Sequence, residues 1–162
     1  MNTEFQKIIR TFKTLNSPFL VTGSWAIKMH AERIGLNPHR PPRDFDFAVS
    51  DFHPFINALA SLGYKLEELR FLGPQTRKVS MKKGFFHVDL LRAGSSLAPG
   101  LRNVVKIGDT PVASLNGLAE KKQNILDTIQ NARARRNLNF LIVLKNFSSN
   151  YYRVKTSHST AL

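Results

Sequence analysis

Two aspartates separated by a single residue, Asp44 and Asp46, have the spacing of a metal-binding pair. They alternate with the apolar residues Phe45 and Phe47, which is the period of a β-strand, so both carboxylates are expected on one face. A third aspartate, Asp89, lies in another alternating stretch. Oxygen ligands of this kind suit Mg²⁺ or Mn²⁺. Acidic pairs at strand ends are more often simply solvated, so the pair alone is weak evidence.

A glycine and a serine, Gly23 and Ser24, follow the short apolar run at residues 19 to 21 and precede a helical pattern. Glycine lets a phosphate approach the backbone, and the free amides at a helix start attract anions. The alternative is an ordinary turn between a strand and a helix. A phosphate cradle followed by an Asp-x-Asp pair and a separate strand aspartate is, however, what transfer from a metal-bound triphosphate requires.

Three motifs together resemble those of the minimal nucleotidyltransferase superfamily related to polymerase beta. They are Gly23-Ser24, Asp44-Phe45-Asp46 and the stretch HVDLL at residues 87 to 91, in the same order and at similar spacing. The resemblance covers roughly residues 17 to 130. It implies an α/β (α+β) fold, in which a mixed sheet is flanked by helices and the active site lies along one sheet edge.

The resemblance also implies roles for the residues that carry it. Asp44 and Asp46 would hold a metal ion that bridges the triphosphate, and Asp89 would complete a second metal site and help to activate the acceptor hydroxyl. The segment SLNGLAEKK at residues 114 to 122 is similar to a helix whose lysine reaches the triphosphate. Lys122 is the better match, with Lys121 as the alternative.

The segment before the first acidic pair matches the family only in part. Arg40 fits the arginine that many relatives carry there, but Pro42 stands where they have threonine. Arg40 and Arg43 adjoin the predicted metals and are expected to contact phosphate. The last helix also departs from the family, because Arg135, Arg136 and Asn139 replace a basic-acidic pair, which leaves the acceptor side undetermined.

The apolar periodicity predicts the elements that must position these residues. Helices are expected at residues 3 to 15, 25 to 35, 55 to 62, 114 to 129 and 133 to 146. Strands are expected at 19 to 21, 44 to 49 and 64 to 69, in a hairpin of 76 to 81 with 85 to 91, and within 103 to 113. Residues 37 to 43, with three prolines, must be an extended loop. We therefore predict one domain over residues 1 to 147, followed by a polar tail at 148 to 162.

Several further residues have two readings. His87 could orient Asp89 or contact substrate, but a local hydrogen bond at the surface is more common. Trp25 and Phe12 could stack on a base, but both lie in apolar helical patterns and are expected in the core. The arginines at 133, 135 and 136 could bind the phosphates of a nucleic acid or could simply be a solvated helix start.

The charge favours a polyanionic partner. With 24 Lys and Arg against 11 Asp and Glu, the chain carries a net charge of +13. No apolar run has the roughly 20 residues that span a bilayer, and there is no cysteine. We therefore expect a cytoplasmic protein that does not bind membranes. A basic surface that only maintains solubility is the alternative.

These observations favour transfer of a nucleoside monophosphate from a nucleoside triphosphate such as ATP to a hydroxyl of RNA, with transfer RNA as one candidate. Protein nucleotidylation is a second acceptor class. An antibiotic acceptor is disfavoured, because a cationic antibiotic calls for an acidic second site, and this chain, with 11 Asp and Glu against 24 Lys and Arg, has almost no acid to spare outside its three key aspartates. The rival from another class is a non-catalytic domain that binds nucleic acid or a partner protein. A second copy or a partner subunit could supply an acceptor-binding surface.

Overall fold

The computed structural model describes residues 2–36, 42, 44–67 and 72–129, together with positions 138, 139, 141, 142 and 144–146. Within the helix that ends at residue 129, side chains are described as far as Lys122. The helices and strands are α1 (Thr3–Lys13), β1 (Phe19–Thr22), α2 (Gly23–Arg33), β2 (Asp44–Val49), α3 (His53–Ser61), β3 (Lys65–Leu66), β4 (Lys78–Lys83), β5 (Phe86–Arg92), β6 (Val104–Ile107), β7 (Thr110–Ala113) and α4 (Leu115–Ile129).

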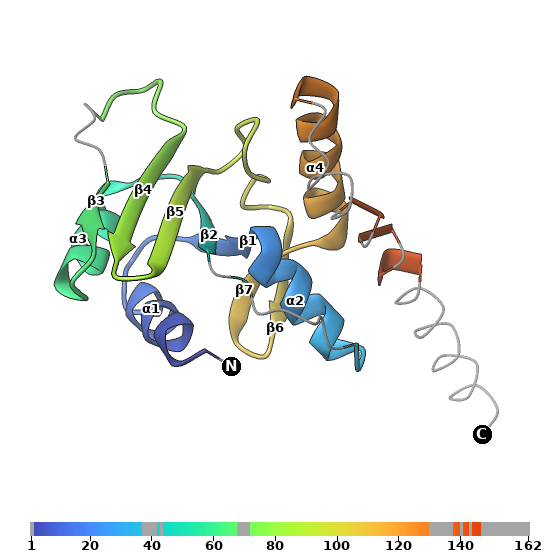
Figure 1. Cartoon of the computed structure of the whole chain (residues 1–162), viewed down its shortest axis with the longest axis horizontal. Coiled ribbons are helices and arrows are strands. Elements are labelled where there is room, and N and C mark those ends of the chain that lie inside the picture. Colours follow the sequence, from blue (N-terminus) through green and yellow to red (C-terminus); the bar gives the residue numbers. More distant parts are fainter. Residues whose placement is uncertain are drawn as a thin grey trace.

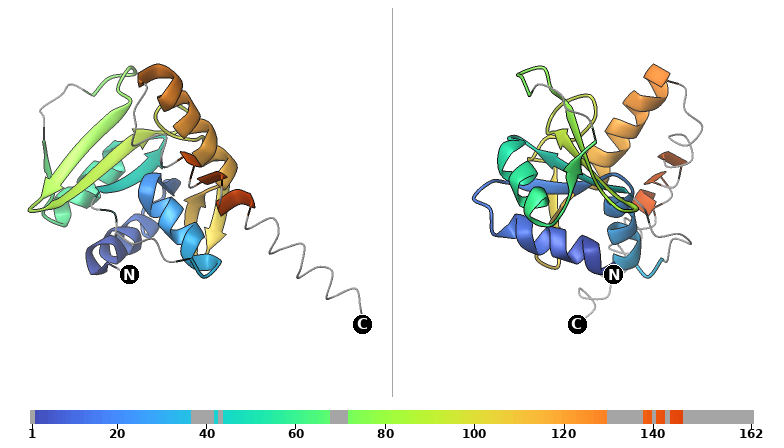
Figure 2. Two further views of the ribbon diagram at one scale, coloured as in Figure 1. Left: turned by 45° about the vertical axis from the view of Figure 1, so that its right-hand side comes forward. Right: turned by 60° about the vertical axis from the view of Figure 1, so that its left-hand side comes forward.

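The strands form one mixed sheet with the order β3-β4-β5-β2-β1-β7-β6. Strand β2 pairs parallel with β5 and antiparallel with β1, and β1 pairs parallel with β7. Helices α3 and α4 lie toward opposite ends of this sheet, with α3 beside β3 and α4 beyond β1 and β7 (Figures 1 and 2). The predicted fold class, a mixed sheet flanked by helices, is confirmed.

One face of the sheet carries the core, and it is rich in aromatic side chains. On β2, Phe45 and Phe47 are fully buried. Phe5 of α1 stacks on Trp25 of α2 with ring centroids 4.2 Å apart, and Phe12 of α1 meets Phe47 edge-on at 4.8 Å. Because α1 and α2 both contact the phenylalanines of β2, they cover the same face of the sheet. The prediction that Trp25 and Phe12 belong to the core is therefore confirmed.

The opposite face of β2, β4 and β5 carries polar side chains beside a small second apolar cluster of Leu20, Ala48 and Ala98. On β4, Val79 and Met81 are buried in the core, while the alternate positions of this strand are exposed or partly exposed. The same alternation holds on β5, where Val88 and Leu90 are buried. Because side chains alternate across a strand, the polar residues of these strands lie together on the face away from the aromatic core.

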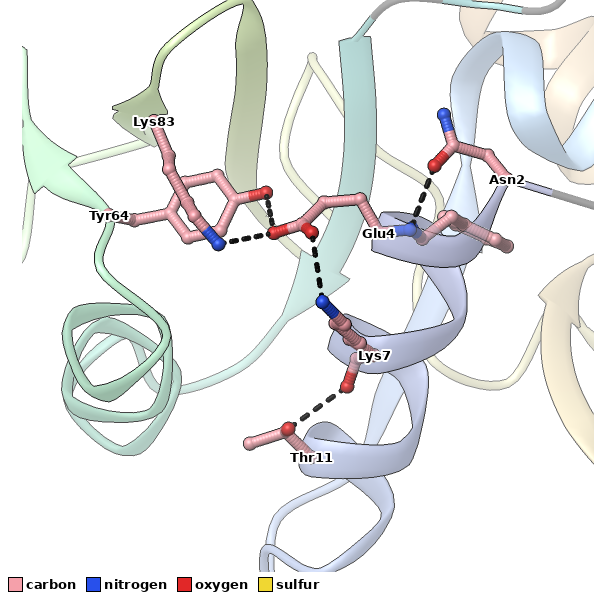
Figure 3. Close-up of polar contacts among 7 residues, drawn as sticks. Asn2, Glu4, Lys7, Thr11, Tyr64 and Lys83 are labelled. Atoms are coloured by element: carbon pink, nitrogen blue, oxygen red, sulfur yellow. Dashed lines mark hydrogen bonds and ion pairs between the residues drawn. The ribbon is translucent and has the colours of Figure 1, made fainter.

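A buried carboxylate fastens α1 to the core side of the hairpin formed by β4 and β5 (Figure 3). Oε1 of Glu4 accepts hydrogen bonds from Tyr64 at 3.1 Å and from Lys83 at 2.9 Å, and Oε2 lies 3.9 Å from Nζ of Lys7. Burial acts to raise the pKa of Glu4. The hydrogen bonds from Lys83 and Tyr64 and the positive charge of Lys83 outweigh this effect of burial, so the pKa is lowered. Asn2 caps the same helix by accepting from the amide of Glu4.

Two of the predicted elements differ from those observed. The strand expected at residues 64 to 69 is reduced to the two residues of β3, and positions 68–71 lie outside the described residues. The hairpin turn was expected around Lys82 to Gly84, but Lys82 and Lys83 are still in β4, and the turn consists of Gly84 and Phe85. Among the described helices, none is long and apolar enough to cross a membrane.

Candidate active site

The register of two adjacent strands brings the predicted carboxylates together. Strand β2 runs parallel to β5 with Asp46 opposite Asp89 and Asp44 opposite His87. Neighbouring strands lie about 4.8 Å apart, so Asp46 and Asp89 have their backbones side by side and share the polar face. Asp44 lies two residues before Asp46 on that face. The chain thus places all three aspartates in one group, although 42 residues lie between Asp46 and Asp89 in the sequence.

Gly23 lies against the carboxylate of Asp46. Strand β1 pairs with β2 so that Thr22 is opposite Asp46, and α2 begins at the next residue. Gly23 has a φ of 61°, and a Cβ added to it would lie 2.1 Å from Oδ2 of Asp46. Both facts require glycine, since an L side chain rarely adopts this φ and would overlap the carboxylate. Glycine therefore allows the start of α2 to lie directly against Asp46.

The first turn of α2 leaves its amides available on this side. The residue before the helix, Thr22, makes no side-chain capping hydrogen bond, and Ser24 is only partly buried. Uncapped amides at a helix start carry partial positive charge and favour an anion. The predicted phosphate-binding segment and the predicted metal-binding residues therefore lie next to each other.

Asp46 is the carboxyl whose chemistry is most altered by this environment. Its pKa is raised to about 7, first by burial, then by the negative charge of Asp89 and, less, that of Asp44. The positive charges of Lys122 and Lys78 act in the opposite direction. The three aspartates thus carry more negative charge than the nearby lysines neutralise. A bound cation would relieve this excess of negative charge.

Two residues of β4, missed in the sequence analysis, hold Asp89. The hydroxyl of Ser80, which lies opposite Asp89 in the sheet, donates a hydrogen bond to Oδ1 at 2.6 Å. Nζ of Lys78 lies 2.7 Å from Oδ2. Both oxygens of Asp89 are thus engaged, one by a hydroxyl and one by an ammonium group. Only the register of the hairpin identifies these partners, because serine and lysine on an exposed strand face carry no signal of their own.

Lys122 of α4 lies near enough to Asp46 for its charge to lower the pKa of that carboxyl. The preference for Lys122 over Lys121 as the lysine that reaches the triphosphate stays a prediction. His87 has its Nδ1 at 3.2 Å from Oε1 of Glu67, which is the local surface contact expected as the simpler reading. Arg40 and Arg43 lie outside the described residues, as do the arginines at 133, 135 and 136.

The three aspartates fit a divalent cation by chemistry, because they offer an all-oxygen donor set with unneutralised charge. Their side chains are not yet arranged around one point. Within the described part of the chain, no three His, Asp or Glu side chains converge closely enough to hold an ion, and Lys78 occupies one oxygen of Asp89. Binding an ion would thus require rotation of these carboxylates and displacement of Lys78.

No family model and no curated sequence matches the chain, whereas several solved structures do. The antibiotic-resistance factor ANT(2'')-Ia, in its solution structure, is 16% identical with a TM-score of 0.62, over 98% of this chain and 96% of that one. Its crystal structure with adenylyl-2''-tobramycin is 16% identical with a TM-score of 0.63, covering 92% and 97% of the two chains. The lincosamide antibiotic adenylyltransferase LnuA, bound to lincomycin, is 15% identical with a TM-score of 0.59, covering 89% and 98%.

Proposed function

Because the chain has the nucleotidyltransferase fold, we propose that it transfers a nucleoside monophosphate from a nucleoside triphosphate to a hydroxyl group. One observation carries this proposal: the pairing of Asp46 with Asp89 on adjacent strands, with the start of α2 held against Asp46 by Gly23. This arrangement would combine a cation-binding edge and a phosphate-binding edge within one group of residues.

The carboxylates would act in two ways. Asp44 and Asp46 would hold Mg²⁺ (or Mn²⁺), and Asp89 would share a second ion; when bound, the ions would supply positive charge to the triphosphate and to the reacting oxygens. Asp89 takes the proton from the acceptor hydroxyl as its oxygen attacks the α-phosphorus. A new oxygen–phosphorus bond forms, the bond to the β-phosphate bridging oxygen breaks, and pyrophosphate leaves with the electron pair.

The phosphates of the nucleotide would be held by the residues around the start of α2. The backbone at Gly23 and Ser24 supplies amide donors, and Lys122 supplies a positive charge near Asp46. By the resemblance of the sequence motifs, Arg40 and Arg43 would contact the triphosphate. Catalysis of this kind depends on positioning and charge, so each of these groups acts by orienting the α-phosphate for in-line attack.

RNA is the acceptor that the charge supports, with transfer RNA as one candidate. The net charge of +13 attracts a polyanion and repels a cationic substrate. ATP is the first nucleotide to test, and a cytoplasmic location would supply both substrates.

A small-molecule hydroxyl is the second candidate acceptor. Two similar structures are antibiotic-modifying proteins by name, and this chain covers 96% of ANT(2'')-Ia and 98% of LnuA. The chain thus has the dimensions of a protein that acts on a small acceptor. Its surplus of basic residues favours a neutral or anionic small molecule over an aminoglycoside.

The test is a labelling assay with each α-phosphate-labelled nucleoside triphosphate, Mg²⁺ and total RNA, followed by separation of RNA, protein and small molecules. We expect label in RNA with the native protein and loss of labelling by at least about a hundredfold in Asp46→Ala. Asp109→Ala is the matched control, since it removes a fully exposed carboxylate from the turn between β6 and β7. Label on a small acceptor would select the second candidate. Absence of labelling together with absence of metal-dependent nucleotide binding would refute the enzyme.

A further inference from the structure

A row of lysines crosses the polar face of the sheet and ends at Asp89. Lys65 of β3 lies opposite Lys82 of β4, and Lys82 lies opposite His87 of β5. Lys78 lies four residues before Lys82 on β4, with its Nζ 2.7 Å from Asp89. Directly opposed residues share a sheet face, so Lys65, Lys82 and Lys78, which we call the lysine track, lie on the face that carries the aspartates.

The lysine track is open to solvent. Lys65 and Lys82 are exposed, and neither forms an ion pair with another described residue. Lys83, the neighbour of Lys82 in sequence, behaves differently: its side chain turns to the core side, contacts Glu4 and lies over the ring of Tyr64 (Figure 3). Because side chains alternate along β4, Lys83 contacts α1 on the core side, while Lys82 faces solvent on the side of the aspartates.

An exposed aromatic ring lies at the end of the same hairpin. Phe85 is 95% exposed, and it forms the turn between β4 and β5 with Gly84, whose φ is 57°. A phenylalanine with so little contact in its own chain offers both faces for stacking. Lysines that track a backbone, combined with an aromatic ring on which a base stacks, are the features by which proteins bind single-stranded nucleic acid.

We propose that the lysine track and Phe85 form the binding surface for a single-stranded RNA acceptor, which they lead toward Asp89. This inference rests on the proposed function, whose acceptor class it specifies. Lys65 and Lys82 bind phosphates, Phe85 stacks on a base, and the strand ends with a hydroxyl near Asp89. A membrane surface fits less well, because Phe85 is the only large aromatic ring exposed among the described residues, and the face also carries the acids of the site.

The experiment measures equilibrium binding of a fluorescein-labelled oligouridylate of about 12 nucleotides by fluorescence anisotropy. Three variants are compared with the native protein: Lys65→Ser/Lys82→Ser, Phe85→Ser, and a control, Arg102→Ser/Lys106→Ser. The control removes the same charge from exposed residues at the opposite end of the sheet, at and just before β6. We expect the track variant to bind roughly tenfold more weakly than the control. Its salt slope should be smaller by about 1.4, because each phosphate that a lysine neutralises contributes about 0.7.

Equal binding by the track variant and the control would overturn the proposal. So would binding of the native protein to vesicles that contain phosphatidylserine without binding to RNA. Phe85→Ser should weaken binding while leaving the salt slope unchanged, since stacking releases no counterions, and a changed slope would contradict the stacking role.

Nucleotide labelling is measured separately on the same preparations. Loss of labelling with retained track-dependent RNA binding would refute only the proposed reaction, and labelling of a small acceptor without RNA binding would refute only the track.

Discussion

Asp46 shows most directly how the fold prepares one residue for a charged partner. Burial and two neighbouring carboxylates raise its pKa from 3.8 to about 7. The folded protein therefore binds this proton more tightly than the unfolded chain does. Ionising Asp46 costs stability, so its contribution makes the free energy of unfolding fall as the pH rises from about 4 to about 7, and the penalty is complete above that range.

Replacing Asp46 by Asn should remove this penalty. At pH 8 we expect the metal-free variant to be more stable than the metal-free native protein by about 1 to 2 kcal/mol. This is less than the roughly 4 kcal/mol that corresponds to a pKa rise from 3.8 to about 7, because the side chain is only partly buried. The advantage should shrink toward pH 4. Urea unfolding at pH 4, 6 and 8 measures it, and Asp109→Asn, at an exposed carboxylate, is the control. A difference that is independent of pH would contradict the assignment.

Gly23 allows a second test, of the close approach between α2 and β2. Gly23→Ala combines an unfavourable φ with overlap on the Asp46 carboxylate, whereas Gly108→Ala has the same φ, 62° against 61°, and nothing within 4 Å of its added Cβ. The φ alone costs about 1 to 2 kcal/mol in each variant. We expect Gly23→Ala to lose at least about 1 kcal/mol more by urea unfolding. Equal losses would mean that Asp46 moves aside freely.

At the residue scale, local sequence patterns pointed to the three aspartates that the fold groups together as a candidate site. The alternation around Asp44 and Asp46, the Gly23 turn and the strand around Asp89 were all visible as local patterns. Ser80 and Lys78 were not, because their contact with Asp89 depends on which residue of β4 faces which residue of β5. A shift of one position in the hairpin turn would have moved both side chains to the core face.

At the scale of elements, the cluster around Glu4 joins α1 to the hairpin that carries Asp89. Glu4→Gln keeps the shape but removes the charge that Lys83 neutralises, so we expect a loss of about 1 to 3 kcal/mol in the free energy of unfolding at pH 7. Because the pKa of Glu4 is lowered from 4.5, this stabilisation is present above its ordinary pKa and is lost as the pH falls below it.

Urea unfolding with Glu32→Gln as a control tests this expectation. Glu32 pairs with Lys28 four residues earlier on the exposed side of α2, a type of pair that contributes about 0.3 to 0.5 kcal/mol. The Glu4 variant should therefore be clearly the less stable of the two. Similar small losses would show that α1 is held by its aromatic contacts alone.

Periodicity predicted the elements well where apolar spacing was strong and less well where short polar strands lie at an edge. The first helix and β2 were found within two residues of their bounds. Strand β3 was predicted too long. Its residues are exposed at the edge of the sheet, so their apolar periodicity does not mark where the strand ends. The hairpin turn was misplaced because Lys82 and Lys83 look like turn residues, although one faces solvent and the other a buried carboxylate.

At the scale of the whole molecule, strand order was not accessible to periodicity. The pairing of β2 with β5 and of β1 with β7 joins distant parts of the chain, and local patterns do not encode such partners. The resemblance to a known fold implied the mixed sheet instead. The charge balance was available from composition alone.

Salt should stabilise this protein, because repulsion among its positive charges exceeds the benefit of its ion pairs. The chain carries 13 more positive than negative charges, and the exposed pair of Lys13 with Asp109 contributes at most about 1 kcal/mol. Raising the ionic strength from about 0.01 M to about 0.15 M shortens the screening length from roughly 30 Å to roughly 8 Å, which removes long-range repulsion but affects close pairs less. We expect the melting temperature to rise by a few degrees in sodium chloride.

Circular dichroism melts over this range of sodium chloride measure the effect, and the double variant Arg102→Ser/Lys106→Ser, with a net charge lowered by two, should show a smaller rise. A low concentration of oligouridylate should produce a comparable or larger rise at low salt, because a bound polyanion neutralises the same field and binds the folded state. If sodium chloride instead lowered the melting temperature, ion pairs would outweigh the net repulsion. The basic surplus would then no longer be the dominant electrostatic property of the folded chain.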